Sequence, residues 1–211
     1  RVAPDEYRRR AMTERMASYD VIIPRVLMQV QPCPQFVVLD AVQQVAVDFF
    51  TRTEVWTDTM AETLFRGSRV VELMTDRGVV VSRVLHLLLD GVRLEGGSDF
   101  HAERAGSGIT VLFHAAHEDA DHTVYAYCAF RPARTAAQVP EALLEEWGDT
   151  LVFGSLAKIK SMSGPRVGWS DPQAAQMNLS LYEQGVAQAR IRGARRGDGR
   201  RLTARPQRGD L

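Results

Sequence analysis

Three histidines near the middle of the chain stand close together in the sequence, with carboxylates around them. The group comprises His114, His117, His122, Glu118, Asp119 and Asp121. Imidazole nitrogens and carboxylate oxygens are ligands of zinc and manganese, so a metal-dependent enzyme is one hypothesis. The spacing matches no zinc signature, however, and the segment falls in a predicted hairpin turn. We therefore interpret it as a solvated acidic loop and predict that the chain binds no metal and no cofactor.

Other residue types that could carry out catalysis occur in unfavourable contexts. Ser155 follows a glycine in the middle of a predicted helix, and no strand leads into it as in a GxSxG nucleophile elbow. His86 lies within an apolar strand and is typical of a core or interface histidine, while His101 lies in a polar loop. No glycine-rich phosphate-binding loop is present in the sequence. We therefore predict no catalytic residues and expect that the protein is not an enzyme.

The composition is that of an ordinary globular protein. Of the 211 residues, 45% are hydrophobic and 25% are charged, and no window is apolar enough for a membrane span. The first 17 residues are charged and lack the apolar region of a signal peptide. Cys33 and Cys128 lie far apart and form no CxxC motif, so we expect two reduced thiols in an intracellular protein.

Arginine is concentrated at the C-terminal end of the sequence. Residues 192–211 hold seven arginines and two aspartates, a net charge of +5, which leaves −5 on residues 1–191. The seven are Arg192, Arg195, Arg196, Arg200, Arg201, Arg205 and Arg208. Such a segment could contact nucleic-acid phosphates, or dock in a protein groove through pairs with carboxylates. A third interpretation is a solubilising tail from an arginine-biased genome, because the chain holds 24 Arg and 2 Lys.

Apolar residues recur with the helical period in two parts of the chain. Residues 34–52 carry a wide apolar stripe, and residues 140–191 are predicted to form two helices joined by a tight turn. Gly164-Pro165 ends the first of these helices, and Asp171-Pro172 suits the N-cap and first position of the second. On the second helix we predict an inward face formed by Ala174, Met177, Leu181, Gly185 and Ala189.

Between residues 62 and 130 the pattern changes to short apolar runs separated by turns. Residues 79–89 are rich in large apolar residues and end in Asp90-Gly91, which indicates a two-residue hairpin turn. We predict an α+β fold: a helical bundle of N-terminal helices and a C-terminal helical hairpin, with an inserted antiparallel β domain and an extended C-terminal arm. The predicted segments are an N-terminal helical segment (1–61), the β domain (62–136), the hairpin (137–191) and the basic arm (192–211).

Several short motifs follow one another along the chain in a distinctive order. The first are Tyr19-Asp20, Cys33-Pro34, Phe49-Phe50-Thr51-Arg52 and Val55-Trp56, followed by Asp90-Gly91, Arg131-Pro132 and Val139-Pro140-Glu141. The second helical pair contributes Trp147, Gly154, Trp169, Asp171, Pro172, Tyr182 and Gly185. In this order the motifs resemble the head–tail connector, or adaptor, proteins of tailed bacteriophages, and the second set resembles that family's C-terminal helical hairpin. The resemblance covers about residues 18–195.

The resemblance implies a structural role in the virion. Proteins of this family form a homo-oligomeric ring, usually a dodecamer, below the portal, where they extend the DNA ejection channel and receive the tail or nozzle. In related connectors the C-terminal segment docks on the portal, which favours portal docking for the arginine-rich arm. The resemblance thus implies synthesis in the bacterial host cytoplasm, a place at the virion neck, no membrane contact, and DNA that only passes through the channel. The alternative is a nucleic-acid-binding accessory protein that acts through the same arginines.

Overall fold

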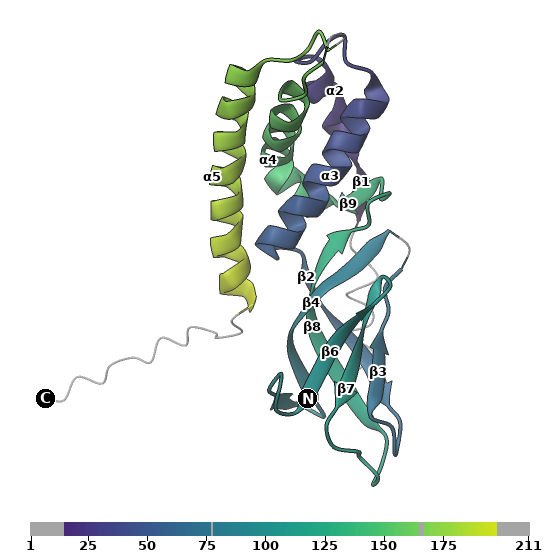
Figure 1. Cartoon of the computed structure of the whole chain (residues 1–211). Helices are drawn as coiled ribbons and strands as arrows, with labels where there is room; N and C mark the ends of the chain where they lie inside the picture. Colours follow the sequence, from purple (N-terminus) through teal and green to yellow (C-terminus); the bar gives the residue numbers. More distant parts are fainter. Residues whose placement is uncertain (1–14, 77, 165–166, 198–211) are drawn as a thin grey trace, which may run out of the picture.

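The computed structural model of the protein describes residues 15–76, 78–164 and 167–197 (Figure 1). The larger helices lie at one end of the molecule and most strands at the other. The helical elements are η1 (Tyr19–Val21), α2 (Ile23–Leu27), α3 (Gln35–Thr53), α4 (Glu141–Lys160) and α5 (Pro172–Gly197). The strands are β1 (Met16–Ser18), β2 (Thr57–Leu64), β3 (Val70–Leu73), β4 (Val79–Leu89), β5 (Val92–Leu94), β6 (Phe100–Ala105), β7 (Gly108–Phe113), β8 (His122–Pro132) and β9 (Gln138–Pro140).

The helix α4 occupies the centre of the helical end. It contacts α2, α3 and α5, and for this reason its buried residues extend around most of its circumference. Fully buried side chains such as Leu151, Leu156 and Ile159 fill the space between α4 and its neighbours. The helix α3 ends at Thr53, and the backbone of its C-cap residue, Glu54, adopts a left-handed conformation with φ 52° that turns the chain toward β2.

Two antiparallel sheets form the other end of the molecule. One has the strand order β2-β8-β4-β5 and the other the order β3-β7-β6. Alternate residues of β7 are buried, as expected for a sheet that covers a core on one face only. Val111 and Phe113 from β7 belong to the same hydrophobic cluster as Leu87 and Val124 from the larger sheet. The two sheets therefore pack together through their inner faces.

A chain of aromatic rings connects the helical end to the sheets. Trp147 of α4 lies 5.7 Å from Phe49 of α3, measured between ring centroids. Phe49 contacts Phe50 at 5.2 Å, and Phe50 contacts Trp56 at 5.7 Å. Trp56 then reaches Phe130 of β8 at 6.2 Å. Helices and sheets thus share one hydrophobic core.

The predicted fold class, a helical bundle with an inserted β domain and an extended arm, is wrong. In the described part of the chain, nine strands form three antiparallel sheets, and only α4 and α5 form a helical hairpin. Because the sheets share their core with the helices, they are not an insertion that packs by itself.

The segments nearest the helices also differ from the prediction. The third sheet pairs β1 with β9, so two segments placed in the bundle contribute strands instead. The strand β2 begins at Thr57, inside the predicted N-terminal helical segment. At the other end, α5 continues to Gly197, so residues 192–197 of the predicted arm are helical and not extended. The rest of that arm, residues 198–211, lies outside the described residues.

Candidate functional site

The helices of the C-terminal hairpin approach each other closely because two glycines face their neighbours. A Cβ atom on Gly154 of α4 would lie 2.6 Å from Val45 of α3 and 2.8 Å from the ring of Tyr182 on α5. A Cβ atom on Gly185 of α5 would overlap the side chain of Thr150 on α4. Tyr182 itself is buried. Three residues of the predicted hairpin set therefore lie where α3, α4 and α5 meet.

The other predicted hairpin residues lie at the start of α5 and in the core. An Asp171 carboxylate oxygen accepts a hydrogen bond from the backbone N–H of Ala174 at 3.0 Å, and Pro172 is the first residue of the helix. This arrangement is the N-cap that the sequence predicts. Trp147 is buried, and Trp169 packs half-buried against the core. These side chains fix where α5 starts and how it lies against α4.

A polar network joins α3 to the middle of α5. The Arg52 guanidinium donates to both carboxylate oxygens of Glu183, at 2.9 and 2.5 Å, and to Asp48 at 3.2 Å. The Tyr182 hydroxyl donates to Asp48 at 2.7 Å, and Nε of Arg190 donates to the backbone oxygen of Arg52 at 3.0 Å. The hydrogen bonds from Arg52 lower the pKa of Glu183, while burial raises the pKa of Tyr182. The charged groups at this contact thus satisfy one another.

The structure describes three of the seven arginines assigned to the docking arm. Arg192, Arg195 and Arg196 lie in the last turns of α5, and Arg192 forms an ion pair with Glu146 of α4. The other four lie outside the described residues: Arg200, Arg201, Arg205 and Arg208. The arginine-rich segment therefore begins as part of a helix that is anchored to the hairpin.

The exposed face of α5 carries almost no charge. Residues 172–189 contain one charged side chain, Glu183, which is paired with Arg52. The other exposed side chains beyond Pro172 in this stretch are Gln173, Gln176, Met177, Leu179, Ser180, Gln184, Ala187 and Gln188. Solvated helix faces usually carry charges, whereas the centres of protein interfaces are depleted of charge and enriched in methionine. This face, called the uncharged face below, is therefore a candidate contact surface.

The sequence placed the buried face of α5 partly in error. Met177 was predicted to pack inward but is 63% exposed, whereas Ala174 and Leu181, predicted on the same face, are half-buried. Gly185 and Ala189 are buried as predicted. The remaining buried positions, which the prediction omitted from that face, are Ala175, Asn178, Tyr182, Val186 and Gly193. Asn178 and Tyr182 are polar or amphipathic, which hides them from a pattern based on aliphatic residues alone.

A second group of exposed apolar side chains lies where α2 leads into α3. Met28 and Phe36 are 78% and 73% exposed. We call these two residues the apolar corner. The connection between α2 and α3 and the start of α5 both lie at the helical tip of the molecule (Figure 1). The chain thus presents two unlike surfaces at the same level.

The structure keeps two of the three clustered histidines together and separates the third, His114, from them. Nδ1 of His114 lies 2.7 Å from a backbone oxygen of another loop. The rings of His117 and His122 lie 4.9 Å apart, and Asp119 lies beside them. Asp90, 32 residues before His122 in the sequence, also joins the group. The hydrogen bonds that Asp90 and Asp119 accept raise the pKa of His122.

The isolated candidates for catalysis remain isolated in space. The buried Ser155 hydroxyl donates to the backbone oxygen of Leu151 at 2.7 Å, so it is committed to its own helix. His86 is half-buried and stacks on Tyr127 at 4.8 Å, and burial lowers its pKa. His101 is exposed on β6. None of these residues contacts a second catalytic group in the part of the chain that the structure describes, apart from the acidic neighbour of His101, Glu103.

Comparisons with models of known protein families and with characterised protein sequences gave no match for this chain. None of the described helices combines the length and the apolar character needed to cross a membrane. What the protein does is therefore inferred from its own surfaces and from the motifs in its sequence.

Proposed function

We propose that the protein is a head-to-tail adaptor of a tailed bacteriophage, a structural virion protein whose copies form a ring between the portal and the tail. The uncharged face of α5 is the observation that carries this proposal. The stretch that carries this face, residues 172–189, has 18 residues and is about 27 Å long, so it offers a long contact strip. A face with so few charges suits contact with another copy of the chain, which would also remove Met177 and Leu179 from water.

The two exposed surfaces favour a ring over a twofold dimer. In this arrangement the uncharged face of one copy, with Met177 and Leu179, packs on the apolar corner of the next, with Met28 and Phe36. A contact between two unlike surfaces is head-to-tail, and it closes into a ring when the rotation is right. The start of α5 and the connection between α2 and α3 lie at the same end of the molecule (Figure 1), so in this proposal an axis parallel to its length relates neighbouring copies.

The charge distribution of the chain is consistent with a ring that surrounds DNA and binds the portal. Residues 1–191 carry a net charge of −5, which suits a channel through which DNA passes without being bound. Residues 192–211 carry a net charge of +5. In this proposal the C-terminal arginines dock on the portal protein, where their guanidinium groups pair with carboxylates. The tail or nozzle protein binds below, a dodecamer is the expected ring, and the protein resides at the virion neck without catalysing a reaction.

A nucleic-acid-binding accessory protein is the second candidate, because seven arginines occur within the last 20 residues. The two candidates differ in how they respond to salt and to portal. Binding to plain duplex DNA through these arginines would weaken steeply as salt rises. An adaptor would bind portal and leave duplex DNA unbound at physiological salt.

Electron microscopy and native mass spectrometry of the purified full chain, alone and with portal, test the proposal. We expect closed rings, and we expect Met177→Asp combined with Leu179→Asp to abolish them while the fold is retained. Val92→Asp is the matched control, because Val92 is 66% exposed but lies on β5, away from the helices. Failure of the wild-type chain to form rings with portal would contradict the proposal, as would intact rings of the double variant.

A further inference from the structure

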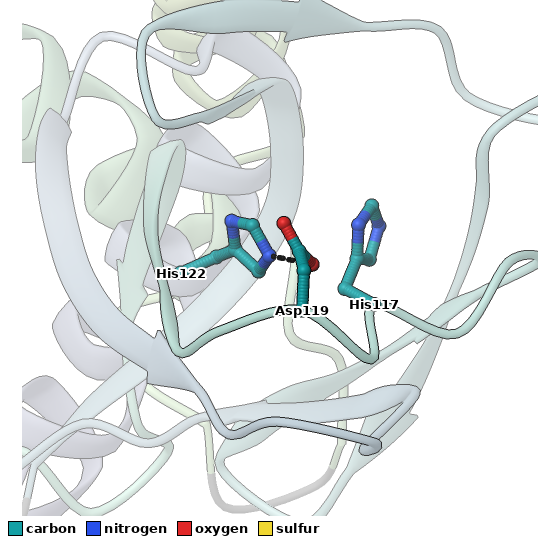
Figure 2. A group of neighbouring side chains, drawn as sticks. All are labelled: His117, Asp119 and His122. Carbon is teal, nitrogen blue, oxygen red and sulfur yellow. Dashed lines mark hydrogen bonds and ion pairs between the residues drawn. The ribbon is translucent and has the colours of Figure 1, made fainter.

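A compact group of metal-ligating side chains lies at the end of the sheets far from the helices. His117 and Asp119 come from the loop between β7 and β8, and His122 is the first residue of β8. One ligand atom from each of the three lies within 4.8 Å of the others. Figure 2 shows the three side chains on one short curve of the chain, with Asp119 between the two rings.

The imidazole of His122 is held by carboxylates on both of its nitrogens. Nδ1 lies 2.6 Å from one oxygen of Asp90, and Nε2 lies 3.1 Å from an oxygen of Asp119. The other oxygen of Asp90 accepts the backbone N–H of Thr123 at 2.8 Å, which fixes that carboxylate. A carboxylate that accepts Nδ1–H holds the tautomer whose Nε2 lone pair is free, and this is how metal-binding histidines are commonly oriented.

The loop that carries the other two side chains is also fixed. The backbone oxygen of His117 accepts the N–H of Gly67 at 2.8 Å, and a carboxylate oxygen of Asp121 accepts the N–H of Arg66 at 2.7 Å. The His117 ring lies edge-on to Phe113 at 6.2 Å. Both sides of the loop are therefore tied to the turn after β2, so the backbone that carries the ligands is fixed before any metal binds.

We propose that His117, Asp119 and His122 bind a divalent transition-metal ion of the zinc class, with Asp90 orienting His122 from behind. Tetrahedral zinc bonds of 2.0–2.2 Å place ligand atoms about 3.4 Å apart. The separation of 3.1 Å between Nε2 of His122 and Asp119 is close to this value, and the metal replaces the hydrogen bond between them. Rotation of the half-buried His117 side chain completes three ligands, and the fourth position is open to water.

The bound ion has a structural role in this proposal. It ties the loop after β7 to the first residue of β8 and thereby holds the far end of the sheets. The inference does not depend on the adaptor function, and it departs from the sequence-based expectation of no metal. Sequence spacing suggested His114 as a ligand, but its Nδ1 contacts the backbone oxygen of Ser98 at 2.7 Å. His114 therefore provides a matched control within the same loop.

Isothermal titration of the EDTA-treated full chain with zinc chloride, combined with elemental analysis after dialysis, tests the site. We expect one zinc ion per chain and a rise in the melting temperature when zinc is present. His117→Ala and Asp119→Asn should each remove this binding, whereas His114→Ala should bind like the wild-type chain. Asp119 is well exposed, so its substitution tests the site even if His117→Ala folds poorly.

Asp90→Asn tests the orienting role separately. Asp90 stands at φ 48°, a conformation that asparagine also tolerates, so the turn should keep its shape. We expect zinc affinity to fall about 10–100-fold, the range typical when the partner of a metal-bound histidine is lost. The proposal is overturned if the EDTA-treated wild-type chain binds no zinc. It is equally overturned if Asp119→Asn binds zinc as tightly as the wild type, or if His114→Ala alone loses it.

Discussion

Arg52 of α3 and Glu183 of α5 form a two-pronged ion pair, in which the two terminal nitrogens of the guanidinium donate to the two carboxylate oxygens. The pair lies beside the buried ring of Tyr182, whose centroid is 5.9 Å from the guanidinium carbon. It uses the only charged side chain of α5 between residues 172 and 189. Because Glu183 is paired with Arg52 of its own chain, its charge needs no partner from a molecule that packs on the uncharged face of α5.

Loss of this ion pair should lower stability modestly and in a pH-dependent way. Both side chains are partly exposed, so we expect Glu183→Gln to lower the free energy of unfolding by about 0.5–1 kcal/mol. Arg52 lowers the pKa of Glu183 in the folded state, so its contribution is present above the unfolded value of about 4.3. It is lost as the pH falls through the lower folded pKa. Urea unfolding at pH 7, 5 and 3 should show the difference between variant and wild type shrinking only at acidic pH.

Glu145→Gln on α4 is the control for that experiment. Glu145 is exposed and has no ion pair within the described residues. We expect its substitution to change stability by less than about 0.5 kcal/mol at every pH, as for most surface positions. If both variants changed the free energy of unfolding equally, the pairing of Glu183 with Arg52 would contribute no more to stability than an unpaired surface carboxylate does.

Two glycines in the helical hairpin should respond oppositely to alanine. A Cβ atom on Gly185 would overlap Thr150, so we expect Gly185→Ala to destabilise the fold by about 1–3 kcal/mol. A Cβ atom on Gly148 would lie 3.6 Å from Ile22, an ordinary contact. Gly148→Ala should therefore stabilise α4 by up to about 1 kcal/mol through helix propensity. Thermal and urea unfolding would measure both, and a neutral Gly185→Ala would contradict the close packing of α4 and α5.

The two thiols should be unreactive in the folded protein. Cys33 and Cys128 are free and buried, and burial raises the pKa of the Cys128 thiol to about 12. Because the thiolate is the reactive form, we expect iodoacetamide at pH 8 to label Cys128 only after the protein is unfolded in urea. Mass spectrometry of labelled peptides would measure this. Rapid labelling of Cys128 in the native protein would show that the inner face of β8 opens to solvent.

Removal of residues 198–211 should separate folding from docking. This cut leaves α5 whole and keeps Arg192 paired with Glu146, so we expect an unchanged melting temperature. In the proposed function it also removes four of the seven arginines, and portal binding should be lost. Co-sedimentation with purified portal rings would measure binding. If the shortened chain binds portal like the full chain, the docking segment lies elsewhere, although the ring proposal would still stand.

The sequence predicted strands well where side chains alone favour them. The run at 79–89 matches β4, and Asp90-Gly91 forms the expected turn, with φ values of 48° and 90°. The strand β2 was missed because its sequence, TDTMAETL, is largely polar and has no strong β pattern. Its eight residues instead pair with β8, which lies 58 to 72 positions further along the chain. Pairing over such distances leaves little trace in local sequence.

The candidate sites were also predictable only where local residue types determine them, and not where they depend on distant parts of the chain. Asp171, Gly154 and Gly185 could be identified because capping and close helix approach need particular residue types at particular places. The histidines and carboxylates around His122 stood out in the sequence, but which of them come together could not be predicted, since that depends on how the loop after β7 folds and on Asp90 from a different turn. The extent of α5 was also underestimated, because Arg192 pairs with Glu146 of α4, a contact that an apolar pattern does not reveal.

The row of rings from Trp147 to Phe130 has a mechanical consequence. It crosses the joint between the helices and the sheets with no gap between neighbouring ring contacts. A hinge at that joint would have to separate buried aromatic surfaces, so bending there is opposed by the hydrophobic effect. A force applied at one end of the molecule is therefore transmitted to the other end with little bending at the joint.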